Sequence, residues 1–237
     1  MDDPINAIME SASVDLAKMR YLACEAKCLE ALRLARDAGR WGDYARILMP
    51  LQEARRQRRM IAADGLIRLG SGSLPGDVSD WLHESPASCI LLTRPHGQRE
   101  AISLVQQSRL NRMHVEVLLV DGFVSDDVWR LMSYSGPPVI VEVEAPLMAW
   151  RDVWMNRHIR RGGKSREPHV DAKGRPPSGW FIDATEKLGD GALASVNQPI
   201  GSVERVAELE RCLDVVTDHE ILHQRLFDAA MAVGKST

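Results

Sequence analysis

The chain has 237 residues, of which 45% are apolar and 27% are charged, and its formal net charge is −3. These proportions are those of an ordinary globular protein, so they exclude a disordered or fibrous chain. The slightly acidic balance argues against bulk electrostatic attraction to nucleic acid or acidic lipid. Because the first residues are acidic and no apolar run approaches the length of a membrane span, we expect a cytoplasmic protein with no membrane partner and with reduced cysteines.

The first predicted element is a long helix from Ser13 to Ala38, in which apolar residues recur at helical spacing without Pro or Gly. Gly39 ends this helix, and a short turn leads to a second helix from about Asp43 to Ala63. Pro50 is expected to kink or briefly break the second helix, because proline removes a backbone donor. Two long helices with so short a connection must lie antiparallel.

Residues around this turn follow a pattern of small and large packing positions. They are Leu34, Ala35, Gly42, Asp43, Tyr44, Leu51 and Ala54. Through them the segment resembles one tetratricopeptide repeat, although Ala31, Ile47 and Arg59 stand where that family prefers an aromatic residue, Ala and Pro. Because a solenoid needs about three repeats, we expect a single hairpin of this type.

The resemblance implies contact with another protein, because that family typically binds peptides or partner helices. A helix of about twenty-five residues is about 40 Å long, which exceeds the width of the small sheet predicted below. Part of its apolar stripe would therefore stay exposed unless a partner covers it. We expect partner contacts from Tyr21, Leu22, Leu29, Trp41 and Tyr44, and a second copy of the chain is the simplest partner.

The middle of the chain alternates between short apolar runs and helical patterns. Leu66 to Leu69 is a candidate short strand before a Gly- and Ser-rich connector, and further strands are predicted at 89–93, 115–120 and 139–143. Helices are predicted at 98–110 and 126–134. Strands separated by helices predict βαβ units and a parallel sheet.

Polar residues follow the predicted strands at the edge where open parallel sheets bind ligands. They are Arg94, His96, Asp121, Asp126 and Glu144. This rim has the donors to hold a polar ligand or a cation, and it lacks the Gly-rich fingerprint of a dinucleotide site. The alternative is that these residues only end strands and cap helices.

The C-terminal part returns to helix. Predicted elements are a helix at 180–188, a turn at 189–191, a short helix to Val196, a helix at 202–216 and a last helix at 217–233. Thr217 and Glu220 form a predicted capping box at the start of the last helix.

The same segment contains His219, Glu220 and His223, the spacing of a zinc hydrolase with two His ligands and a Glu general base. The capping box would engage Glu220, and a third ligand would have to come from upstream, for instance His158 or His169. We expect no cofactor, with zinc as the alternative.

A basic segment precedes these helices. Its cationic residues are Arg157, Arg160, Arg161, Lys164 and Arg166. The segment lacks hydrophobic periodicity, so a long loop is predicted. Such a loop can wrap phosphates, which makes a nucleic-acid-associated protein a second alternative.

The sequence therefore predicts an α/β protein with an N-terminal antiparallel helical hairpin, a small three- to four-stranded, mostly parallel sheet with crossover helices, and C-terminal helices. The predicted segments are a hairpin at 1–69, a linker at 70–88, the sheet at 89–149, the basic loop at 150–179 and C-terminal helices at 180–237. The function expected is that of a non-enzymatic interaction or scaffold protein that self-associates through the hairpin. A metal-dependent hydrolase and a nucleic-acid-associated protein remain as alternatives.

Overall fold

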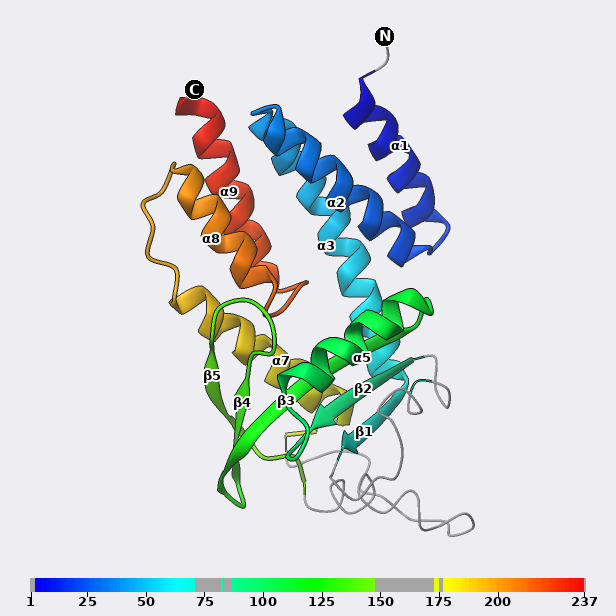
Figure 1. Cartoon of the computed structure of the whole chain (residues 1–237), viewed down its shortest axis with the longest axis vertical. Helices are drawn as coiled ribbons and strands as arrows, with labels where there is room; N and C mark the ends of the chain where they lie inside the picture. Colours follow the sequence, from blue (N-terminus) through cyan, green and yellow to red (C-terminus); the bar gives the residue numbers. More distant parts are fainter. Residues whose placement is uncertain (1–2, 71–81, 83–86, 148–172, 175–176, 237) are drawn as a thin grey trace. The chain divides into compact units, whose positions relative to one another are not determined.

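The computed structural model describes residues 3–70, 82, 87–147, 173–174 and 177–236 (Figure 1). Their contacts divide the chain into two compact units. The helical unit comprises Met1–Arg58 and Ala192–Thr237, and the sheet unit comprises Arg59–Gly191. The predicted α/β class with N-terminal and C-terminal helices is confirmed, and the two sets of helices belong to one unit although the sheet separates them in sequence. No described helix has the length and apolar character needed to cross a membrane.

The N-terminal part of the helical unit begins with α1 (Pro4–Ala17) and α2 (Tyr21–Asp37), which pack against each other. The Ile5 amide donates a hydrogen bond of 3.1 Å to the Asp3 carboxylate, which caps α1. The prediction of one helix from Ser13 to Ala38 is wrong, because the chain turns between these helices. At the turn Met19 has a φ of 57°, in the left-handed region. No Gly or Pro marks this turn in the sequence.

Helix α3 (Trp41–Asp64) follows α2 after a short turn and is helical throughout, so Pro50 does not break it. Cys24 on α2 lies 4.0 Å from the Pro50 carbonyl on α3, measured from its sulfur. Glu25 of α2 pairs with Arg55 of α3 one turn further along. The end of α2 joins the start of α3 by a short turn, while Glu25 near the start of α2 pairs with Arg55 and Arg58 in the second half of α3, so the two helices are antiparallel, as predicted.

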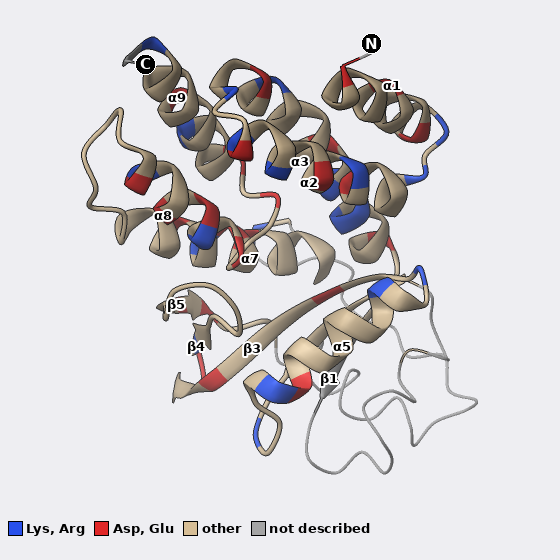
Figure 2. Cartoon of the chain, turned by 45° about the horizontal axis from the view of Figure 1, so that its top comes forward, with Lys and Arg blue, Asp and Glu red and all other residues tan. Residues whose placement is uncertain are grey.

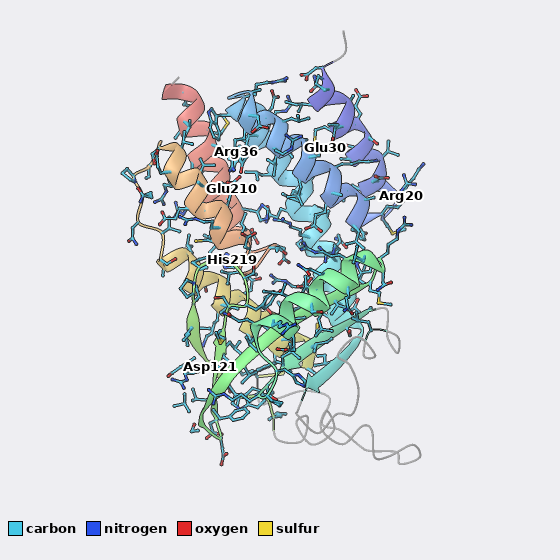
Figure 3. All side chains as sticks on the ribbon, in the orientation of Figure 1. Arg20, Glu30, Arg36, Asp121, Glu210 and His219 are labelled. Atoms are coloured by element: carbon cyan, nitrogen blue, oxygen red, sulfur yellow. The ribbon has the colours of Figure 1, made fainter. Side chains whose placement is uncertain are left out.

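Helices α8 (Val203–Leu213) and α9 (Glu220–Ser236) complete the helical unit and pack against each other. They also contact the N-terminal helices. The Tyr44 hydroxyl and the Arg36 guanidinium both reach Glu210 of α8, and Figure 3 shows Arg36 and Glu210 facing one another. A Cβ added at Gly234 of α9 would lie 3.2 Å from the Trp41 Cβ, so these backbones approach closely. The C-terminal helices therefore cover the face of α3 that carries Trp41 and Tyr44.

The sheet unit contains a sheet whose five described strands lie in sequence order. They are β1 (Leu66–Gly70), β2 (Ala87–Leu92), β3 (His114–Ser125), β4 (Val128–Met132) and β5 (Ile140–Glu144). The first three strands are parallel, whereas β4 is antiparallel to both β3 and β5. The helix predicted at 126–134 is therefore wrong, since this segment is β4. The sheet has one strand more than predicted and is mixed.

Helices pack on both faces of this sheet. On α5 (Gln98–Leu110), Ala101 and Leu104 pack in one apolar core with Leu92 of β2 and Leu119 of β3. Figure 2 shows that α5 carries charged residues only near its two ends, and its buried residues Ala101, Leu104 and Ser108 lie along one face between them.

Helix α7 (Pro177–Ala194) packs on the opposite face, where Trp180 meets Trp129 of β4 with ring centroids 6.1 Å apart. The turn predicted at 189–191 is wrong, because α7 continues through these residues. Glycine at position 191 has a packing role here. A Cβ at Gly191 would lie 2.7 Å from Val141 and 2.8 Å from Val139, so its absence permits the close approach.

Candidate functional site

Exposed and half-buried apolar side chains lie in the turn between α1 and α2 and on both of these helices. Met19 in the turn is 71% exposed, Val14 of α1 is 48% exposed and Leu29 of α2 is 42% exposed. Tyr21 and Leu22, in the first turn of α2, are half-buried. Leu22 and Leu29 are seven residues apart, so they lie on one face of the helix. We call these five residues the α1–α2 patch.

Met19 is unusual within the patch in both conformation and exposure. Its φ of 57° places a long apolar side chain in the left-handed region, which costs a residue with a Cβ about 1–2 kcal/mol. An exposed apolar side chain held by an unfavourable backbone is a feature that clusters at binding sites. Methionine is also frequent at adaptable binding surfaces, because its side chain is flexible and polarisable.

Two residues predicted to contact a partner lie instead in the core of the helical unit. Tyr44 is fully buried and Trp41 is 7% exposed, with their ring centroids 5.6 Å apart. Burial raises the pKa of Tyr44 to about 12, and its hydroxyl donates a hydrogen bond to Glu210. The prediction of surface contacts by Trp41 and Tyr44 is therefore corrected, whereas Tyr21, Leu22 and Leu29 remain accessible. The sequence could not show this difference, because the covering helix lies about 170 residues further along the chain.

Charged residues of both signs are interspersed on α2 and α3 (Figure 2), and one group of them is buried. The Glu25 carboxylate accepts a hydrogen bond of 3.0 Å from Arg55, and it also pairs with Arg58. Arg55 donates a further hydrogen bond of 2.9 Å to the Thr217 carbonyl, just before α9. This buried charge cluster therefore joins α2 and α3 to the C-terminal helices.

The candidate zinc motif lies at the start of α9, where Figure 3 labels His219. The predicted capping box is wrong, because the Leu222 amide donates to His219 Nδ1 at 3.2 Å, which makes His219 the capping residue. The His223 Nε2 lies 3.0 Å from the Thr217 carbonyl and donates to it. Both imidazoles are buried, whereas Glu220 is exposed. Among the described residues, no three or more His, Cys, Asp or Glu side chains gather as a metal site would require.

The predicted rim at the strand ends is partly assembled in the sheet unit. Arg94, His96 and Asp121 line one cavity of about 710 Å³, between the loop after β2 and strands β3 and β4. Leu119 and Met132 contribute apolar surface to the same cavity. Three of the five predicted rim residues therefore lie together.

Asp126 and Glu144 lie away from this cavity. Leu92, the last residue of β2, is level with Leu119 of β3, but β3 continues to Ser125 and pairs there with β4. Glu144 pairs with the far end of that hairpin. It lies four residues further along the strands than the point in the sheet that is in register with Leu92. At about 3.3 Å per residue this is about 13 Å along the strands. The extended hairpin separates these two carboxylates from the loop after β2.

Most of the predicted basic loop at 150–179 lies outside the residues that the structure describes, and its last residues, 177–179, belong to α7. Arg157, Arg160, Arg161, Lys164 and Arg166 all fall outside the described residues, as do His158 and His169. The predictions made for them stay predictions.

The residue that sequence reasoning missed is Met19. The signal that points to it is the start of α1, where Asp3 precedes Pro4 in the order of a helix cap followed by a first-turn proline. A helix that begins there and another that runs through residues 21–37 leave room for a turn near residue 19.

Comparison of the chain with protein-family models, with curated proteins and with solved structures finds no match. The resemblance of one segment to a tetratricopeptide repeat therefore stays a prediction.

Proposed function

We propose that the chain is a non-enzymatic interaction protein that self-associates through the α1–α2 patch. The observation that carries the proposal is Met19, whose apolar side chain is 71% exposed from a left-handed backbone position. A partner that buries this side chain would offset the cost of presenting it to water.

The neighbours of Met19 extend this surface. Val14 and Leu29 are exposed, and Tyr21 and Leu22 are half-buried, so apolar side chains from α1 and α2 continue on both sides of the turn. Tyrosine and methionine are enriched at protein interfaces. The patch therefore has the composition of an interface core.

A second copy of the chain is the simplest partner for the patch. In a two-fold dimer the same surface patch occupies both sides of the interface. The resemblance to a tetratricopeptide hairpin points in the same direction, because that family binds other polypeptides.

The test is sedimentation velocity of the purified full chain at micromolar concentration, compared with Met19→Gly. We expect a dimer for the natural sequence and at least about a tenfold loss of dimer affinity for Met19→Gly, because the variant removes the anchoring side chain. Glycine has no Cβ penalty in the left-handed region, so the thermal unfolding midpoint of the variant should not fall.

The matched control is Ile200→Ser, which removes an apolar side chain that is 80% exposed elsewhere in the same unit. It should leave the dimer unchanged. A monomeric natural protein at tens of micromolar, or an equal effect of Ile200→Ser, would contradict self-association through the patch.

The hydrolase alternative has less geometric support, because the backbone engages both imidazoles of the motif and Glu220 points to solvent. Stoichiometric zinc in the purified protein, lost in His223→Ala, would favour the hydrolase. The nucleic-acid alternative depends on the basic loop. Binding that falls steeply with salt and disappears when those arginines are neutralised would favour it.

A cytoplasmic location belongs to the same proposal. The cysteines Cys24, Cys28, Cys89 and Cys212 are buried free thiols, which suit a reducing compartment. Fractionation of the expressing cells should recover the protein with cytoplasmic markers.

A further inference from the structure

The cavity at the strand ends offers a second binding site, in the sheet unit. It lies beyond the carboxyl end of β2, and its volume of about 710 Å³ is within the range of small-molecule sites, about 300–1,000 Å³. Ligands of open α/β sheets bind beyond the carboxyl ends of parallel strands. The position and the size both suit a small organic ligand.

Arg94 supplies a positive charge to this cavity. Its side chain is exposed, and it makes no ion pair with any residue that the structure describes. Half-buried His96 stands two residues further along the same loop and lines the same cavity. A guanidinium presents a planar fork of donors that matches a carboxylate or phosphate.

The acidic groups near the cavity already have partners. Asp121 lies 3.6 Å from a guanidinium nitrogen of Arg130. Glu100 of α5 accepts a hydrogen bond of 2.8 Å from the Gly97 amide, and this bond lowers the pKa of its carboxyl. Because Glu100 occupies the start of α5 in this way, the helix terminus is not the anion site. Among the residues that the structure describes, Arg94 is left as the cation without an acidic partner, so the cavity suits a ligand with a single negative charge.

The remaining lining is mainly apolar. Pro95, Leu119, Val120 and Met132 all contribute to the cavity. Leu119 belongs to the apolar core beneath α5 and Met132 packs against that core, so both side chains are held in place. A ligand that fills the cavity must therefore carry an apolar portion beside its charged group.

We propose that this cavity binds a small organic anion with one charged group and an apolar body, with Arg94 pairing with the anion and the apolar residues contacting the body. A guanidinium pairs with both carboxylates and phosphates, so either group fits the position beside Arg94. The apolar lining favours a monocarboxylate.

The test is a titration of the purified full chain with 3-phenylpropionate, followed by amide NMR. We expect shifts for residues 94–98 and saturation with a dissociation constant on the order of 1 mM, as for a ligand of this size. Two further probes separate the contribution of the charged group from that of the apolar body. 3-Phenylpropanamide, which has the same shape without the charge, should bind at least about tenfold more weakly. Inorganic phosphate, which lacks the apolar body, should also bind more weakly.

The variant Arg94→Gln should weaken 3-phenylpropionate at least about tenfold. The matched control is Arg99→Gln, an exposed arginine on α5 that does not line the cavity, which should bind like the natural protein. Both substitutions are at exposed positions, and their unfolding midpoints should confirm that the fold is kept.

Absence of binding by 3-phenylpropionate, equal binding of the amide, or no effect of Arg94→Gln would overturn the proposal. Phosphate binding as tightly as 3-phenylpropionate would overturn the assignment of an apolar body. These outcomes are independent of self-association, because the cavity and the α1–α2 patch belong to different units.

Discussion

Glu25 is the carboxylate on which the buried charge cluster depends. It is 4% exposed and pairs with both Arg55 and Arg58, which are also buried. Removing one member of a buried ion pair leaves charge without compensation, which costs about 3–5 kcal/mol. We therefore predict that Glu25→Gln lowers the free energy of unfolding by about 3 kcal/mol in urea titrations.

The control for this variant is Glu53→Gln, which removes a carboxylate paired with Arg56 at the surface. Exposed ion pairs contribute about 0–1 kcal/mol, so this change should be small. Equal effects of the two variants would show that the buried cluster contributes no more than a surface pair.

His223 makes the stability of the helical unit depend on pH. Burial, together with the charge of Arg55 and the neighbouring His219, lowers its pKa from 6.5 to about 4, while the Thr217 carbonyl opposes the shift. As the pH falls, His223 is therefore protonated near pH 6.5 in the unfolded chain but only near pH 4 in the folded chain. The contribution of His223 to the free energy of unfolding is complete above pH 6.5 and falls as the pH drops toward 4.

The variant His223→Gln should remove this dependence and keep a donor for the Thr217 carbonyl. Between pH 7 and pH 5 we predict that the natural protein loses about 2 kcal/mol more free energy of unfolding than the variant does. The measurement is urea denaturation at both pH values. Parallel losses in the two proteins would show that folding does not shift the pKa of His223.

At the scale of elements, the passage from α3 to β1 depends on Gly65. A Cβ at this position would collide with the Ala87 carbonyl, which belongs to the strand beside β1. Because the obstacle is backbone, it cannot move aside as a flexible side chain would. We predict that Gly65→Ala destabilises the protein by about 1–3 kcal/mol or more in thermal or urea unfolding.

Gly42 is the matched position for this test. It lies in the first turn of α3, and a Cβ there would meet nothing within 4 Å. Alanine is favoured over glycine in helices by about 0.5–1 kcal/mol, so Gly42→Ala should stabilise the protein. The same substitution is thus expected to have opposite signs at the two ends of one helix.

Elements whose local pattern agrees with their surroundings could be predicted from the sequence. Helix α5 spans Gln98–Leu110 as predicted, and the apolar runs of β2 and β3 lie where they were expected. Two of the errors occur where distant contacts decide the structure. Strand β4 is short and is held by pairing with β3 and β5, whereas α7 continues past Gly191 because Val139 and Val141 pack against it.

In the candidate sites too, residues placed by neighbouring strands could be predicted, whereas residues whose position depends on distant contacts could not. Arg94, His96 and Asp121 were placed together by the order of strands, because β2 and β3 are parallel neighbours. Glu144 could not be placed, because its distance from them depends on how far the β3–β4 hairpin extends. Burial of Tyr44 depends on Glu210 and so required the fold of the whole unit.

At the scale of the molecule, the helical unit is assembled from the two ends of the chain. Arg55 donates to the Thr217 carbonyl, Tyr44 donates to Glu210, and Gly234 lies close to Trp41. The N-terminal helices alone would expose Trp41 and Tyr44 and would leave the buried charge cluster partly open to water. We therefore predict that a chain ending at Ser195, after α7, loses the cooperative unfolding of its N-terminal helices and binds a hydrophobic dye.

The missing helices, supplied as a separate peptide of residues 196–237, should restore the unit, because α8 has its own cap in Ser202 and docks through side chains rather than through the connection. The measurement is the loss of dye fluorescence and the gain in thermal midpoint on adding the peptide. A Glu210→Ala peptide is the control and should restore the unit less well, since Glu210 receives both Tyr44 and Arg36. If the truncated chain instead unfolds cooperatively and binds no dye, the N-terminal helices form a stable body alone. Trp41 and Tyr44 would then be open to a partner when α8 and α9 detach.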